Sequence, residues 1–143
     1  MIVIDTNVIS EVMRAQPAPA VLAWFGAQEA RMLYLSAVGE AELRRGAAIL
    51  PPGQRRDLLV TQIDAMINED FSGRVLPFDS AAARAFAAID GDRRGAGRPI
   101  TFADGQIAAT ARAHGATLAT RNVTDFEGCG VEVINPWNVG MAS

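Results

Sequence analysis

The stretch MIVIDTNVIS (1–10) decides the fold. Its apolar start runs directly into an acid, Asp5, and two small polar residues, Thr6 and Asn7, before the apolar pattern resumes at Val8. A short apolar run that stops at a polar turn is typical of a buried parallel strand. A secretory signal needs a basic start and a longer apolar core, so we interpret these residues as part of the mature fold.

The same strand pattern recurs along the chain and alternates with segments of helical spacing. Strands are predicted at 1–5, 32–36, 117–120 and 131–134, with a further edge or bent strand over RVLPF, 74–78, where Pro77 cannot donate a ladder hydrogen bond. Helices are predicted at about 7–14, 18–29, 37–49, 53–70, 79–94 and 102–114. This order predicts an α/β fold, a three-layer sandwich with a mostly parallel central sheet flanked by helices. GDRRGAGRP, 91–99, is interpreted as a flexible loop at the rim.

Length and composition limit the class of protein. A chain of 143 residues that is 50% apolar predicts one domain, 1–143, with one hydrophobic core and no membrane span. The single cysteine, Cys129, has no partner for a disulfide or a zinc knuckle, which favours the reducing cytoplasm. All 13 basic residues are arginine, so mechanisms that need a lysine, such as a P-loop or a Schiff base, are excluded.

The charge balance argues against a protein that simply coats nucleic acid. The net charge is −3, whereas such binding usually comes from a basic surface. Arginine pairs still offer local basic islands, or else solvated helix faces: Arg44/Arg45, Arg55/Arg56 and Arg93/Arg94, with Arg98 nearby.

Polar groups stand at several predicted strand ends and helix starts. They are Asp5, Glu42, Asp104, and Asn122 with Asp125. If the sheet gathers them, the carboxylates face one another, and like charges that close do not all stay ionised unless a cation neutralises them. Oxygen ligands without histidine or cysteine suit Mg²⁺ or Mn²⁺ rather than zinc, and the lone histidine is interpreted as structural.

Each acid also has a purely structural explanation. Thr101 and Asp104 have the spacing of an N-terminal capping box. Glu42 fits a helix surface beside arginines, and Asp125 fits a turn. Asp5 is harder to explain in this way, because an acid directly after a buried run costs desolvation unless something binds it.

Together these motifs resemble the PIN-domain ribonucleases, in particular the VapC-type toxins of bacterial toxin-antitoxin pairs and their FitB-like branch. The resemblance is carried by MIVIDTNVISE, LSAVGEAELRRG, ITFADGQIAATARAHGATLATRNVTDF and VEVINPW. It implies a PIN-like fold and an endoribonuclease that depends on Mg²⁺, with Mn²⁺ as a substitute. It also implies inhibition by a small VapB-type antitoxin, a homodimer, and contact with operator DNA only through the antitoxin.

Carried over to this chain, the family's acids fall on Asp5, Glu42 and Asp104. We predict Asp5 and Asp104 as direct metal ligands and Glu42 as a ligand or a water-mediated contact. The fourth acidic position falls on Asn122, which carries no charge, while Asp125 stands three residues later as a supporting acid. Because Asn122 carries no charge, the sequence does not decide whether the site holds one metal ion or two.

The resemblance also suggests supporting and substrate-binding residues. Thr6 and Asn7 match the polar pair that supports the first acid, and Thr120 is predicted to orient the cluster. Arg98 and Arg121 are the candidates for holding flanking phosphates of an RNA substrate.

Two other classes of function were weighed. A phosphoacceptor signalling domain is a small α/β protein with acids at strand ends, but it needs a lysine that this chain lacks. A catalytically silent PIN-like binding or scaffold protein stays open, because the amide at the fourth position could abolish turnover. Metal titration separates the silent protein from the enzyme.

Overall fold

A central sheet of parallel strands organises the structure, a computed structural model that describes residues 1–139. The strands are β1 (Ile2–Ile4), β2 (Leu33–Ser36), β3 (Val75–Leu76), β4 (Thr117–Ala119) and β5 (Val133–Ile134). Their order is β3-β2-β1-β4-β5, and every pairing is parallel. The expectation of a mostly parallel sheet is confirmed, and β3, which precedes Pro77, lies at an edge as predicted.

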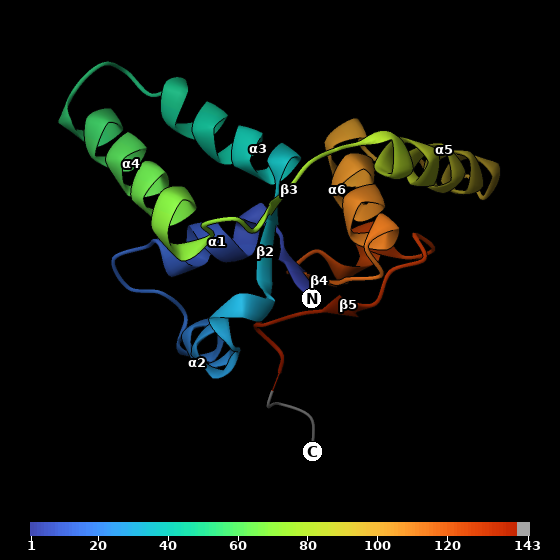
Figure 1. Ribbon diagram of the computed structural model, residues 1–143, viewed down its shortest axis with the longest axis horizontal. Coiled ribbons are helices and arrows are strands. Elements are labelled where there is room, and N and C mark those ends of the chain that lie inside the picture. The colour runs from blue at the N-terminus through green and yellow to red at the C-terminus, as the bar shows by residue number, and fades with distance from the viewer. Residues whose placement is uncertain (140–143) are drawn as a thin grey trace.

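Helices cover both faces of this sheet. Figure 1 shows α1, α2, α3 and α4 on one side of the strands and α5 and α6 on the other. The helices are α1 (Thr6–Val12), α2 (Pro19–Ala27), α3 (Ala37–Ala48), α4 (Gln54–Ala65), α5 (Ser80–Gly95) and α6 (Phe102–Ala113), with short turns η1 (Ala30–Met32), η2 (Met66–Asp70) and η3 (Val123–Phe126). Across residues 1–139, no helix has the length and apolar character that crossing a membrane requires.

Alternation along the strands builds two separate apolar clusters. In β1, Ile4 packs into the cluster shared with α1 to α4, whereas Val3 packs into the cluster under α5 and α6. In β2, Leu35 and Tyr34 divide between the same two clusters. The sheet is therefore buried on both faces, which confirms the predicted three-layer sandwich.

The strand order also locates the place where a ligand is expected. From β1 the chain moves outward through β2 to β3, and it then returns to the other side of β1 to form β4 and β5. The reversal lies between β1 and β4, and in open parallel sheets ligands are expected beyond the carboxyl ends of the strands at such a point. Asp5 directly follows β1, and Thr120 directly follows β4.

Two segments differ from the sequence expectation. The helix predicted over 53–70 ends at Ala65 and continues as the single π turn η2, in which the Phe71 N–H donates to the Met66 carbonyl at 3.0 Å. The segment 91–99 is not a flexible loop, because α5 extends to Gly95 and the buried Arg93 anchors it. The Arg93 guanidinium donates to the carbonyls of Arg98 (2.6 Å) and Glu127 (2.5 Å).

Candidate metal-binding active site

Asp5 is held at the junction between β1 and α1. It is only 4% exposed, and as the N-cap of α1 it accepts a hydrogen bond from the Thr6 N–H to Oδ1 at 2.8 Å. Its own N–H donates to the Ala119 carbonyl at 2.9 Å, which ties the end of β1 to the end of β4. The backbone therefore fixes where this carboxylate lies.

The second oxygen of Asp5 is held by side chains from both strand ends. The Thr120 hydroxyl donates to Asp5 Oδ2 at 2.7 Å, and the Asn7 amide donates to the same oxygen at 3.3 Å. Asn7 also contacts Thr120, with 3.2 Å between Nδ2 and Oγ1. The structure thus brings together the predicted supporting residues Thr6, Asn7 and Thr120 around the first acid.

Glu42 approaches this cluster from α3. The Thr6 hydroxyl donates to Glu42 Oε1 at 3.3 Å, so one threonine contacts both acids. Two residues that the sequence reasoning missed position the helix: the N-cap Ser36, which accepts from the Gly39 N–H at 2.9 Å, and Gly39 itself. A Cβ on Gly39 would lie 3.1 Å from Ser36 Oγ, which is closer than an ordinary contact, so glycine leaves room for the Ser36 hydroxyl that caps α3.

Asp104 lies in the first turn of α6. The Thr101 hydroxyl caps the helix by accepting from the Asp104 N–H at 3.2 Å. Among the hydrogen bonds of residues 1–139, the reciprocal bond of a capping box, from the Thr101 N–H to the Asp104 carboxylate, is not formed. Helix capping therefore explains Thr101 but not the acid.

Burial, and to a smaller extent neighbouring negative charges, raise the pKa values of Asp5, Glu42 and Asp104. Burial raises the pKa of Asp5 and the charge of Asp104 adds to this, while the hydrogen bonds from Thr120 and Thr6 oppose it. Burial also raises the pKa of Glu42, with further contributions from the charges of Asp5 and Asp104. Burial raises the pKa of Asp104, partly offset by Thr101, and the charge of Asp125 raises it further. The negative charges of these acids therefore act on neighbouring carboxyl groups, which favours their protonated forms unless a cation binds.

This donor set suits a hard divalent cation. Between residues 1 and 139, no arginine forms an ion pair with Asp5, Glu42 or Asp104. In the same part of the chain, no three acidic, histidine or cysteine side chains are close enough to enclose an ion by themselves. An ion held here would keep part of its water shell, which is the ordinary behaviour of Mg²⁺.

The remaining predicted site residues, Asn122, Asp125, Arg98 and Arg121, differ in what their side chains and backbone groups contact. The Asn122 N–H donates to the Thr120 hydroxyl at 3.1 Å, and the Asn122 side chain is exposed. Asp125 lies in η3, near enough to Asp104 to act on its pKa. Arg98 pairs with Glu127 at 3.0 Å, whereas the Arg121 guanidinium lies 4.9 Å from the centre of the Trp137 ring.

The fold and the site together define an α/β protein with an acid cluster at the reversal point of a parallel sheet. The family model described as the PIN domain matches residues 2–127. The chain therefore belongs to the PIN-domain family, and the resemblance inferred from its motifs is confirmed.

Similar proteins extend along almost the whole chain. The VapC ribonuclease Y4jK of Sinorhizobium fredii is 49% identical over 137 residues, covering 96% of this chain and 98% of that protein. The toxin FitB of Neisseria gonorrhoeae is 44% identical over 138 residues, with 96% and 99% covered. Among solved structures, FitAcB from Neisseria gonorrhoeae matches with a TM-score of 0.91 and 43% identity, covering 97% of this chain and all of that one. FitAB bound to an IR36 DNA fragment matches with a TM-score of 0.90 at the same identity, with 96% of each chain covered.

Proposed function

We propose that this protein is an endoribonuclease dependent on Mg²⁺ or Mn²⁺ and the toxin of a toxin-antitoxin pair. One observation carries the proposal: Asp5 is a buried carboxylate that shares the Thr6 hydroxyl with Glu42 and has no cationic side chain paired with it within residues 1–139. Burying a charge in this way is costly unless a cation compensates it. The similarity to a VapC ribonuclease and to FitB supports the same activity, which we place in the cytoplasm.

The chemistry of the site follows from its residues. Asp5 and Asp104 would hold the metal directly, and Glu42 would hold it directly or through water. When bound, the ion would polarise the scissile phosphate and lower the pKa of a bound water. Thr120, Asn7 and the Thr6 N–H keep Asp5 in one orientation, which leaves its remaining lone pairs for the ion. Asp125 would support Asp104 from η3.

The products of cleavage test this reaction. Attack by a metal-activated water does not use the 2′-hydroxyl, so we expect 5′-phosphate and 3′-hydroxyl ends. End-labelled RNA is incubated with purified protein, freed of antitoxin, in Mg²⁺, Mn²⁺ or EDTA. Cleavage that persists in EDTA, or that gives 2′,3′-cyclic phosphate as the primary product, rules the proposal out.

The proposed partner is a small VapB-type antitoxin. The similar FitAB and FitAcB structures support this pairing, and we extend it to a homodimer that reaches operator DNA only through the antitoxin. Such a partner would inhibit by placing an arginine among the acids, which satisfies the same charges as the metal. Adding the purified cognate antitoxin should suppress cleavage, and undiminished cleavage with the complex formed would defeat this part of the proposal.

A catalytically silent PIN protein is the second candidate. It is favoured by the amide of Asn122 at the fourth acidic position and by the lack of three mutually close acids within residues 1–139. Calorimetric titration with Mg²⁺ and Mn²⁺ separates the two candidates. The enzyme should bind the ions and cleave RNA in their presence, whereas a silent protein should bind them weakly or fail to cleave when it binds them.

A further inference from the structure

A groove leads away from the acid cluster along α1. It has a volume of about 450 Å³, and its lining residues come from α1 and the two residues after it, from α3 and the loop after it, and from α4. Thr6 and Glu42, which already belong to the acid cluster, line it, and Ser10, Arg14 and Arg55 line the rest of its polar wall. The groove is therefore continuous with the candidate active site.

We propose that the RNA strand leaves the scissile position through this groove and that Arg14 and Arg55 hold its flanking phosphates. The proposal rests on the proposed ribonuclease function. Between Thr6 and Val12, α1 rises about 9 Å at ~1.5 Å per residue, so Arg14 lies well away from the acids. It would therefore contact a neighbouring phosphate and not the one that is cleaved.

Arg14 is positioned by an acid on its own segment. Its Nη1 lies 3.2 Å from both oxygens of Glu11, and Glu11 is itself fixed by the Ala18 N–H at 2.9 Å. Glu11 is 7% exposed, whereas the Arg14 side chain remains 65% exposed. The pair thus holds the guanidinium at the groove while its other N–H groups stay available to a phosphate.

Arg55 is a cation without a carboxylate partner. No ion pair involves it within residues 1–139, in contrast to Arg44 on α3, which is bound by Glu40 at 2.8 Å and Asp64 at 2.7 Å. It lies in the first turn of α4, whose N-cap, Gly53, supplies no side-chain acceptor for the free backbone N–H groups. The positive end of the helix dipole adds to the charge of Arg55, and Asp57 in the same turn offsets part of it.

The floor of the groove suits nucleobases. It is apolar and consists of Met13, Leu43, Gly46, Leu50, Leu59 and Ile63. An apolar floor beneath a basic wall binds single strands with little sequence preference, because every base has an apolar face. Arg14 and Arg55 favour a polyanion over a peptide as the occupant, because successive phosphates of a nucleic acid can bind both guanidinium groups at once.

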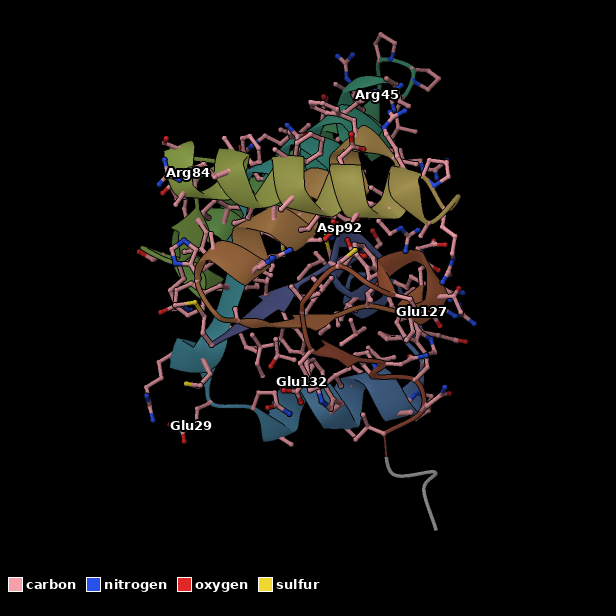
Figure 2. All side chains as sticks on the ribbon, turned by 90° about the vertical axis from the view of Figure 1, so that its right-hand side faces the viewer. Glu29, Arg45, Arg84, Asp92, Glu127 and Glu132 are labelled. Carbon is pink, nitrogen blue, oxygen red and sulfur yellow. The ribbon has the colours of Figure 1, made fainter. Side chains whose placement is uncertain are left out.

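Binding of a fluorescent single-stranded RNA tests the proposal, with Ca²⁺ in place of Mg²⁺ to slow cleavage. The variants are Arg14→Gln and Arg55→Gln. The matched control is Arg84→Gln on α5, which lies on the other side of the sheet from α1, α3 and α4 (Figure 1) and faces the viewer in Figure 2. Arg84 forms no ion pair within residues 1–139, and its Nη1 donates a hydrogen bond to the Ser80 hydroxyl at 3.0 Å. Each groove variant should weaken binding about tenfold. Each should also reduce the slope of log affinity against log salt by about 0.7, the value for one phosphate contact on a single strand.

The outcomes separate this inference from the function beneath it. Wild-type protein that binds and cleaves RNA, together with groove variants that bind as tightly as the Arg84→Gln control, overturns the groove proposal alone. The same is true if the groove variants change only the affinity for an antitoxin. Wild-type protein that neither binds nor cleaves RNA overturns both proposals. RNAs shortened on one side of the cut locate the contact further, because shortening on the groove side should affect the wild type more than Arg55→Gln.

Discussion

At the scale of single residues, Asp5 has two roles that oppose each other. As the N-cap of α1 it stabilises the fold, but its burial next to Asp104 raises its pKa and makes its charge costly. The hydrogen bonds from Thr120 and Asn7 reduce this cost without removing it. A bound cation would compensate the remaining cost of the Asp5 charge, so this carboxylate is suited to bind one.

Thr120 tests how far Asp5 depends on its neighbours. Thr120→Val keeps the shape of this fully buried residue but removes the 2.7 Å hydrogen bond to Asp5. We expect Mg²⁺ affinity to fall by about 10-fold to 100-fold, as for other partners of metal ligands. Thr120→Ser, which keeps the hydroxyl, should bind Mg²⁺ nearly as the wild type does. Calorimetry checks both, and equal affinities for valine and serine would contradict the role of the hydroxyl.

The raised carboxyl pKa values predict a pH dependence of stability without metal. Above about pH 4, the unfolded chain has released protons that folded Asp5 still holds, so the free energy of unfolding falls as pH rises. Asp5→Asn removes this contribution, and the variant should gain stability relative to the wild type over the same range. The lowered pKa of Glu11 acts with the opposite sign but is common to both proteins.

Urea denaturation in EDTA at several pH values between about 4 and 7 measures this difference. Mg²⁺ should then stabilise the wild type and leave Asp5→Asn unchanged. A difference between variant and wild type that does not vary with pH would contradict a raised pKa for Asp5.

At the scale of elements, Arg93 connects the end of α5 to the loop before α6 and to Glu127, which directly follows η3. It is 7% exposed, and its guanidinium satisfies two backbone carbonyls, those of Arg98 and Glu127. Arg93→Ala leaves both carbonyls without this donor and should lower the free energy of unfolding by about 2–4 kcal/mol. The neighbouring Arg94, exposed and paired with Asp90 on the same helix, provides the control, because Arg94→Ala should cost under about 0.5 kcal/mol. Equal effects in urea denaturation would contradict the anchoring role.

The packing of α6 on α5 gives a second prediction at this scale. A Cβ on Gly105 would lie 2.7 Å from the Phe86 ring, which also contacts Phe78 and Phe102. Gly105→Ala should therefore lower the free energy of unfolding by about 1–3 kcal/mol and displace the adjacent Asp104. Gly91→Ala, on α5 with open space around its Cβ, should instead raise it by up to about 1 kcal/mol. The opposite order in thermal unfolding would contradict this packing.

Sequence patterns were sufficient for the elements but not for their junctions. The strand ends that carry Asp5 and Thr120 were predictable because apolar runs stop there, and parallel strands bring such ends to one edge. The burial of Arg93 was not predictable, since its partners are backbone carbonyls that carry no sequence signal. The same holds for Gly39, whose lack of a side chain leaves room for the Ser36 hydroxyl at the start of α3. The π turn η2 has a similar origin, as the sequence continues a helical pattern through it.

At the scale of the whole molecule, the fold brings acids from distant parts of the chain near enough for their charges to affect one another's pKa values. Asp5 follows β1, Glu42 lies on α3 and Asp104 on α6, so both helical layers and the sheet contribute. The motifs named the candidate acids, but the packed structure was needed to show that no three of them are close together within residues 1–139. The groove with Arg14 and Arg55 also required the packed structure, because its walls come from α1, α3 and α4. The homodimer and the roles of the acids stay predictions.

The rate of metal-dependent RNA cleavage by Asp104→Asn tests the central claim most directly. Its control is Asp92→Asn, an exposed acid on α5 outside the cluster (Figure 2). Asn122→Asp reports on the amide at the fourth position. We predict that Mg²⁺-dependent cleavage falls at least about 100-fold in Asp104→Asn, because the amide would hold less tightly the cation that stabilises the negative charge of the transition state. Cleavage should remain at the wild-type rate in Asp92→Asn, and Asn122→Asp should cleave at least as fast as the wild type. Wild-type cleavage by Asp104→Asn, with the same need for metal, would show that the acid cluster is not the catalytic site.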